Sequence, residues 1–224
     1  MASIIFPTAY LPPISWWVHA LHFQEIQIEV HETFPKQTYR NRCLIFSSAG
    51  LLPLSIPVKK VFGTHTPTSE IRIDNSRNWQ LVHWRSIESC YNKTPYFLYY
   101  KDIFSPYYHS AFDRLVDFNS LLLKVCFDLL KIDTVKVSET TDYVRRRQYP
   151  EFRELIHPKL LAKETGIIGF PRYFQAFEPM HGFKENLSII DLLFNVGPET
   201  AAYLREVRLR NFNEQNATLR GNQP

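Results

Sequence analysis

The hydrophobic and polar positions at the start of the chain predict a strand, a helix and a second strand. The apolar run Ser3–Phe6 indicates a short buried strand. Pro12 and Pro13 favour the first turn of a helix that extends to about His22, because that turn leaves its amides unpaired anyway. Glu25–Val30 alternates in polarity, as a half-buried strand does. We therefore expect a βαβ unit whose two strands are parallel and joined by a right-handed crossover.

The middle of the chain predicts a hairpin followed by helices. Two β-rich runs flank the Ser/Gly turn at 47–50, and prolines confine the second run to a sheet edge. An apolar stripe at helical spacing over 111–131 is the strongest helical pattern in the chain. The remaining expected elements are a loop over 59–69, strands over 70–73 and 134–137, helices after the capping residues 74–76 and over 94–104, and two helices around Gly197–Pro198.

These elements place the protein in the α/β class. We expect an N-terminal βαβ unit, a central mixed sheet with flanking helices and a helical C-terminal part. Residues 138–172 are polar and weakly patterned, so a loop with short helices is expected there. The length fits one domain over residues 1–210. Residues 211–224 are polar throughout and predict a disordered tail.

The composition excludes one large group of nucleotide and cofactor sites. The 224 residues include 15 Pro, 4 Trp, 12 Tyr and 17 Phe but only 7 Gly, which are dispersed along the chain. Dinucleotide-binding and P-loop motifs need clustered glycines, because the backbone must approach the phosphates closely. The sequence therefore predicts no glycine-loop chemistry, and no cofactor or metal is assigned.

The charge and the cysteines indicate the surroundings in which the protein works. With 26 basic and 22 acidic residues the net charge is +4, too mild an excess to predict a nucleic-acid partner. Cys43, Cys90 and Cys126 are far apart and have no metal-binding spacing, so we expect reduced thiols. The sequence shows no signal-peptide pattern and no apolar run long enough to span a membrane. A cytoplasmic location is predicted.

The most distinctive polar segment follows the second predicted strand. It contains Lys36, Gln37, Arg40, Asn41 and Arg42. Ligands of open α/β sheets bind beyond the carboxyl ends of the strands, where this segment should lie. The arginines offer planar donor pairs for phosphate or carboxylate, while the amides can orient other polar groups. The alternative is a solvated edge whose arginines pair with nearby acids.

Two histidine patterns are weaker candidates. Trp79 and His83 lie one helical turn apart, so His83 could act as a general base or a ligand donor. The alternative for Trp79 is stacking in the core. His19, His22 and Glu25 have a spacing that could present metal ligands on one face. Local packing and hydrogen bonding is the alternative for these histidines.

An ordered set of short motifs resembles one known family. The motifs are Tyr10-Leu11-Pro12, residues 36–42, Leu54-Ser55-Ile56-Pro57-Val58, Trp79-x-x-x-His83, Tyr91-x-x-x-Pro95-Tyr96-Phe97 and the block 186–199. Their order from about Ser3 to Leu204 is similar to the WbqC-like protein family. The resemblance implies a bacterial protein of surface-polysaccharide biosynthesis, in O-antigen-like gene clusters, and a transferase role. This chain departs from longer members at Val30-His31, where they have an Asp-Asp pair, and in its shorter section 138–172.

Two functions from different classes follow. The first is an aminoacyl- or acyl-transferase acting on an amino sugar or sugar nucleotide, in which Lys36, Gln37, Arg40, Asn41 and Arg42 bind the substrate. Tyr10 or Trp79 would stack a ring, and His83 would move the proton. The second is a non-catalytic binding or scaffold protein that kept the fold, which the two departures favour. In addition, the aromatic residues near Tyr96 could form a homodimer surface.

Overall fold

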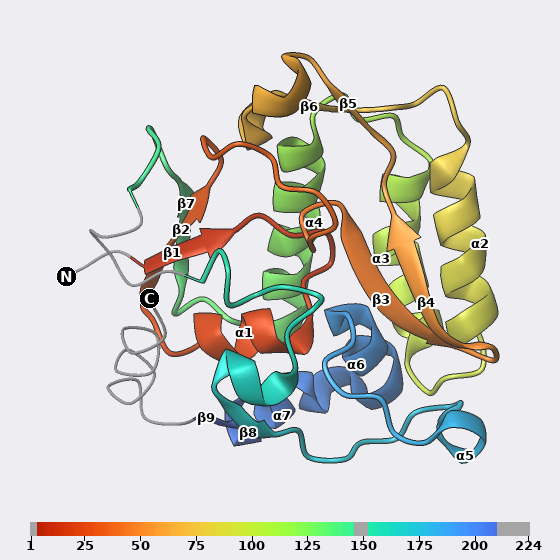
Figure 1. The fold of residues 1–224 in the computed structure, drawn as a ribbon. Helices are drawn as coiled ribbons and strands as arrows, with labels where there is room; N and C mark the ends of the chain where they lie inside the picture. Colours follow the sequence, from red (N-terminus) through yellow and green to blue (C-terminus); the bar gives the residue numbers. More distant parts are fainter. Residues whose placement is uncertain (1–3, 146–151, 210–224) are drawn as a thin grey trace.

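The N-terminal βαβ unit is present as predicted. The computed structural model describes residues 4–145 and 152–209 (Figure 1). Strands β1 (Ile4–Pro7) and β2 (Glu25–Glu29) are parallel and are joined through helix α1 (Ile14–Ala20). Strand β7 (Lys136–Glu139) adds to the other side of β2, also parallel, which gives the order β1-β2-β7. The carboxyl ends of three strands therefore meet at one edge.

The other strands form two-stranded antiparallel sheets. They are β3 (Arg42–Ser47) with β4 (Gly50–Ser55), β5 (Val58–Lys60) with β6 (Ile71–Ile73), and β8 (Ile167–Gly169) with β9 (Arg208–Leu209). The mixed α/β class is confirmed, with the strands distributed over small sheets. The predicted loop over 59–69 is partly wrong, because residues 58–60 pair with β6 and short 3-10 helices cover 63–65 and 68–70.

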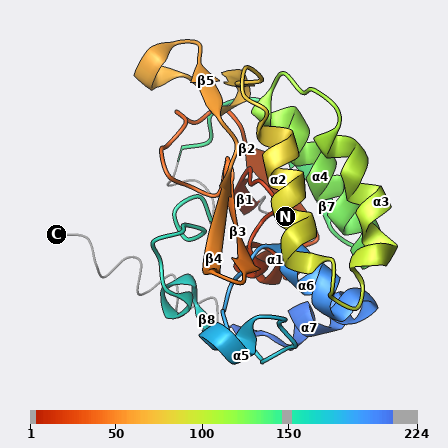
Figure 2. The ribbon, with the colours of Figure 1, turned by 90° about the vertical axis from the view of Figure 1, so that its right-hand side faces the viewer.

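Three long helices stand side by side in one layer (Figure 2). They are α2 (Trp79–Tyr91), α3 (Phe97–Tyr108) and α4 (Leu115–Leu130). The predicted stripe of α4 faces inward, with Phe118 and Leu122 fully buried. This layer covers the hairpin β3–β4 and the parallel sheet, and the rings between them explain much of the aromatic content.

The C-terminal part is helical, as predicted. It contains α5 (Glu178–His181), α6 (Ile189–Val196) and α7 (Thr200–Glu206). The segment before α6 is bonded to the N-terminal unit, since the Ile14 amide donates to the Leu187 carbonyl at 2.9 Å and the Ser15 amide to Asn186 Oδ1 at 2.8 Å. Asn186 thereby satisfies an amide at the start of α1, a helix without a side-chain cap of its own. The predicted tail 211–224 lies outside the described residues.

Candidate functional site

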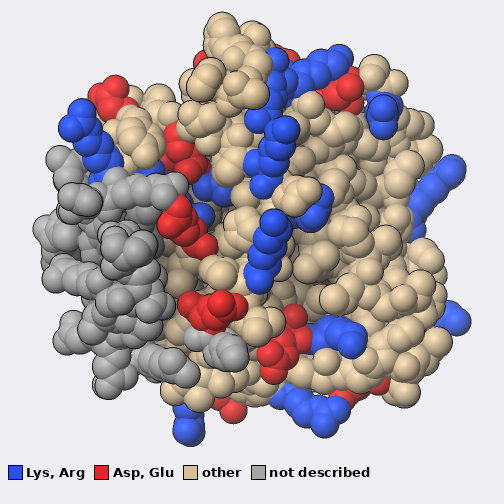
Figure 3. Space-filling view, viewed as in Figure 1, with Lys and Arg blue, Asp and Glu red and all other residues tan. Residues whose placement is uncertain are grey.

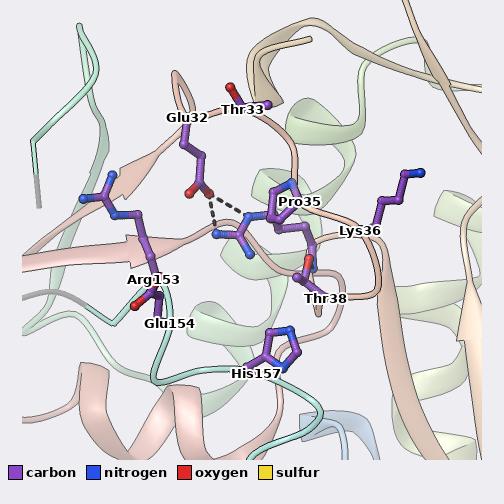
Figure 4. A pocket seen from close by; sticks show the side chains of 9 residues that line it. Glu32, Thr33, Pro35, Lys36, Thr38, Arg153, Glu154 and His157 are labelled. Atoms are coloured by element: carbon purple, nitrogen blue, oxygen red, sulfur yellow. Dashed lines mark hydrogen bonds and ion pairs between the residues drawn. The ribbon is translucent and has the colours of Figure 1, made fainter. Parts of the chain in front are cut away.

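A polar cavity of about 380 Å³ lies beyond the carboxyl end of β2. It falls within the range of roughly 300–1,000 Å³ that is typical of small-molecule sites, at the sheet edge where α/β proteins bind ligands. Figure 3 shows acidic and basic side chains gathered in the central left part of this face, whereas the area over β3 and β4 is mostly uncharged. The residues that line the cavity are Glu32, Thr33, Pro35, Lys36, Thr38, Arg40, Arg153, Glu154 and His157 (Figure 4).

The segment 32–40 forms one wall because several long-range contacts hold its backbone. The Phe34 amide donates to the Thr66 carbonyl at 3.0 Å, and the Tyr10 amide donates to the Tyr39 carbonyl at 2.9 Å. Asn119 of α4 donates from Nδ2 to the Arg40 carbonyl at 2.8 Å. The chain between these anchors reverses direction, with Gln37 in the left-handed region at φ 58°. Three hydrogen bonds to other parts of the chain therefore hold this wall in place.

An ion pair between Glu32 and Arg40 lies in this wall. Arg40 Nε donates to Glu32 Oε1 at 2.7 Å, and a second guanidinium nitrogen contacts the same oxygen (Figure 4). The Glu32 side chain is 10% exposed and the Arg40 side chain 3%. The other carboxylate oxygen, Oε2, has no hydrogen-bond partner among the described residues. Burial raises the pKa of Glu32 above its ordinary value, although the nearby Arg40 charge opposes the shift.

A second ion pair connects the sheet to the opposite wall. Arg153 Nη1 lies 3.2 Å from Glu29 Oε2, and both side chains are at most 1% exposed. Glu29 also accepts from the His31 amide at 2.7 Å, the Val144 amide at 2.9 Å and the Thr140 hydroxyl at 3.1 Å. A buried carboxylate with this many donors holds the segments around it in one arrangement. The residues that follow Arg153 are thus placed at the cavity.

His157 presents a hydrogen-bond donor to the cavity. Its Nδ1 accepts from the Lys159 amide at 3.1 Å, which requires that the proton of the neutral ring sits on Nε2. Desolvation lowers the pKa of His157, and the charges of Lys159 and Arg40 lower it further. The ring is therefore neutral near pH 7, and its Nε2–H group can donate to a ligand oxygen.

The predicted substrate-binding segment contributes to the cavity only in part. Lys36 and Arg40 line it. Gln37 is exposed beside it, Asn41 donates from Nδ2 to the Ile56 carbonyl at 2.9 Å, and Arg42 donates from Nε to Ser55 Oγ at 3.1 Å on the hairpin. The side chains of Arg40 and Arg42 thus serve different places, because β3 begins at Arg42 and its pairing with β4 directs that residue onto the hairpin.

Tyr10, Trp79 and His83 come together in the core and not at the cavity. The Tyr10 hydroxyl lies 3.0 Å from His83 Nδ1 and 2.7 Å from the Tyr108 hydroxyl, and the Tyr10 and His83 rings are stacked at 5.6 Å. Trp79 meets His83 edge-on at 5.1 Å. Burial lowers the pKa of His83 to about 4. The expected convergence of Arg40, Arg42, Tyr10 and His83 on one pocket does not occur, because tyrosine and imidazole satisfy each other inside the protein.

Sequence reasoning missed most of the other cavity residues. Glu32 comes two residues after the second predicted strand, so its position at the sheet edge was a usable signal, whereas Glu29 lies within that strand. Arg153, Glu154 and His157 belong to the weakly patterned section 138–172 and carry no comparable signal. Their place depends on long-range contacts such as the bond from the Phe152 amide to the Ile5 carbonyl, at 2.7 Å.

The remaining alternatives can be compared with the structure. His19 Nε2 bonds to the Thr165 carbonyl at 2.8 Å and His22 Nδ1 to the Val18 carbonyl at 2.8 Å. In residues 4–145 and 152–209 we find no cluster of three or more His, Cys, Asp or Glu residues suited to a metal ion. The three cysteines are buried and unpaired. Leu98 and Tyr99, near Tyr96, are 66% and 75% exposed, and the homodimer there stays a prediction.

None of the helices in the described ranges is both long and apolar enough to cross a membrane. The fold and the cavity define an α/β protein with a polar cavity at the carboxyl edge of a short parallel sheet. The chain belongs to the WbqC-like protein family, whose model matches residues 8–152. That match includes the first wall of the cavity and Glu29 itself, but it ends one residue before Arg153 and well before the block 186–199.

One relative found among known proteins is uncharacterized protein Rv1507c of Mycobacterium tuberculosis. It is 28% identical over 200 aligned residues, which cover 78% of this chain and 85% of the relative. The comparison with solved structures gave no significant match.

Proposed function

We propose that the protein is an acyl- or aminoacyl-transferase acting on an amino sugar, free or within a sugar nucleotide, in bacterial surface-polysaccharide biosynthesis. The observation that carries the proposal is the cavity at the sheet edge. Its lining combines a carboxylate that can accept a proton (Glu32), a neutral hydrogen-bond donor (His157) and a cation (Lys36). The biosynthetic setting rests on the resemblance to the WbqC-like family, to which the chain belongs.

The chemistry of the cavity suits the transfer of an acyl group to an amine. The attacking amine must lose a proton as the new C–N bond forms and the bond to the leaving group breaks. Glu32 Oε2 is free to accept that proton, and a carboxylate whose pKa is raised is a better base than an ordinary one. The Nε2–H group of His157 would donate to the carbonyl oxygen as negative charge develops there. Lys36 would bind an anionic group of the substrate.

A second function is supported by a specific observation. The Trp79-x-x-x-His83 motif of the family resemblance is sealed in the core, where His83 cannot reach a ligand in the cavity. A protein that binds a polar ligand without transforming it would show the same arrangement. In that case Glu32 and His157 would contribute to ligand affinity, and no transfer of an acyl group would be detected.

The first experiment measures ligand binding by calorimetry with amino sugars and sugar nucleotides. We expect a ligand to bind and to stabilise the protein by about 2.7 kcal/mol when it is present at 100 times its dissociation constant. Lys36→Ala should weaken binding, while Arg42→Ala, which alters a residue outside the cavity, should not. Failure of the whole panel to bind, or equal effects of both substitutions, would contradict the proposal.

The second experiment separates catalysis from binding. Once a ligand is known, turnover with activated acyl donors should depend on pH through an ionisation above the ordinary range of a glutamate. Glu32→Gln should abolish this dependence of turnover on pH and slow transfer about a hundredfold or more. The affinity for the ligand should change much less. Circular dichroism would verify folding of the variant. Unchanged turnover in a folded Glu32→Gln protein would leave the binding function as the better account.

A further inference from the structure

We propose that the ligand held in the cavity carries at most one negative charge together with an amino or hydroxyl group, so that a nucleoside diphosphate is not part of what the cavity binds. The inference rests on the proposed function, which leaves open whether the sugar is free or nucleotide-linked. It follows from how the charges of the cavity are already distributed among the protein's own residues.

Both arginines of the cavity are committed to carboxylates. Arg40 holds Glu32 through two of its nitrogens, and Arg153 holds Glu29 through Nη1 while Nη2 donates to the Val144 carbonyl at 2.9 Å. In Figure 4 the guanidinium of Arg153 points away from His157. Each pair is nearly or fully buried, and removing a partner from such a pair leaves a costly isolated charge. An incoming polyanion would have to compete with carboxylates that are already bonded to both arginines.

Among the described residues, 4–145 and 152–209, the rest of the cavity lining has little uncompensated positive charge. Lys36 is exposed at the rim, where Figure 4 shows its side chain directed away from the Glu32 ion pair. His157 is neutral near pH 7 because its pKa is lowered. Glu154 adds a second carboxylate to the lining. Diphosphate sites rely on several uncompensated cations, a metal ion or a row of backbone amides. The lining residues that the structure describes offer one lysine for this purpose.

The uncommitted polar atoms specify the other half of the ligand. Glu32 Oε2 can only accept a hydrogen bond, so it requires an amino or hydroxyl donor. His157 Nε2–H and the Thr33 hydroxyl can serve sugar oxygens. A donor near Glu32 and a single anion near Lys36 together describe an amino sugar with one carboxylate, as in an aminouronic acid.

The test is a calorimetric comparison of four probes: glucosamine, glucosaminuronic acid, UDP and UDP-N-acetylglucosamine. We expect glucosaminuronic acid to bind at least tenfold more tightly than either uridine compound. Its affinity should fall only slightly between low and physiological salt, since one charge is involved. Tighter binding of UDP or UDP-N-acetylglucosamine than of the free sugars would overturn the inference and leave the proposed function standing. Absence of binding by all four would contradict both.

Two lysine substitutions locate the single anion. Lys36→Gln should weaken glucosaminuronic acid about tenfold and leave glucosamine within twofold, because only the former has a carboxylate. Lys93→Gln removes another exposed charge, two residues beyond the end of α2, and should change neither. If Lys36→Gln weakened the binding of both sugars equally, Lys36 would not bind the ligand carboxylate, and its assignment as the anion site would be wrong.

Discussion

At the scale of single residues, three titratable side chains are sealed away from the cavity and make stability depend on pH in opposite directions. Asp191 accepts hydrogen bonds from the Tyr91 hydroxyl at 2.7 Å and the Tyr173 hydroxyl at 2.6 Å. His19 and His83 are bonded inside the protein as neutral rings. In each case burial disfavours the charged form, so the acid and the histidines respond oppositely.

Desolvation raises the pKa of Asp191 to about 6, and the hydrogen bonds from both tyrosines oppose the shift. In the unfolded chain this carboxyl titrates near 3.9. The folded state therefore binds the proton more tightly, so the contribution of Asp191 is complete below about pH 4 and is lost as pH rises to about 6. The difference is about 3 kcal/mol in the free energy of unfolding.

Asp191→Asn removes this contribution. We expect the free energy of unfolding of the variant to fall more steeply than that of the wild type as pH decreases from about 6 to 4. Urea denaturation at closely spaced pH values measures the slopes. Glu185→Gln, an exposed change made for comparison, should leave the slope unaltered. Parallel curves for Asp191→Asn and the wild type would show that the carboxyl titrates normally.

The histidines predict a loss of stability in acid. Desolvation lowers the pKa of both His19 and His83 to about 4, against about 6.5 in the unfolded chain. Their contribution is complete above about pH 6.5 and is lost as pH falls towards 4, by about 3 kcal/mol each. His83→Gln should remove about half of this acid slope, whereas His65→Gln, on an exposed turn, should remove none. Histidine titration by NMR provides an independent check on the wild type.

At the scale of elements, local pattern was sufficient wherever an element could be recognised from its own residues. The first βαβ unit, the hairpin β3–β4 and the apolar stripe of α4 follow from periodicity and turn residues. The strands β5, β8 and β9 have two or three residues, too few to show an alternation. Strands β8 and β9 pair across nearly forty residues of sequence, so only the folded chain could reveal them.

Gly197 shows how one element constrains another. Its backbone has φ 56° and ψ −122°, a combination suited to glycine, and a Cβ atom there would lie 2.4 Å from the Tyr96 ring. We expect Gly197→Ala to cost about 3 kcal/mol or more in the free energy of unfolding, from backbone strain and overpacking together. Thermal denaturation would measure the loss.

Two further variants make the Gly197 prediction specific. Gly169→Ala places a methyl group where no atom lies within 4 Å, so a change within about 1 kcal/mol is expected. In a Tyr96→Ala background the added methyl has room, and Gly197→Ala should then cost only its backbone strain. Equal losses with and without the Tyr96 ring would show that contact with the ring is unimportant.

At the scale of the whole molecule, the candidate site combines a part that sequence could locate with a part that it could not. Parallel strands predict a ligand edge, and Lys36 and Arg40 do lie there. The opposite wall comes from residues more than a hundred positions later, carried by a section without periodic pattern. Arg42 and His83 were assigned to the same site because sequence spacing cannot distinguish a hairpin contact or a core hydrogen bond from a ligand contact.

The Glu29–Arg153 pair connects the parallel sheet to the second wall, so it should affect both the stability of the protein and the shape of the cavity. Glu29→Ala removes a fully buried carboxylate that is paired with the guanidinium of Arg153, and we expect a loss of about 3–5 kcal/mol in the free energy of unfolding. Glu29→Leu combined with Arg153→Met removes both charges and should cost clearly less than the sum of the single changes. A complete double-mutant cycle by urea denaturation measures the coupling. Because the same pair positions the segment that reaches His157, ligand affinity should fall even in the better-folded double variant, and an unchanged affinity there would show that the second wall is placed without it.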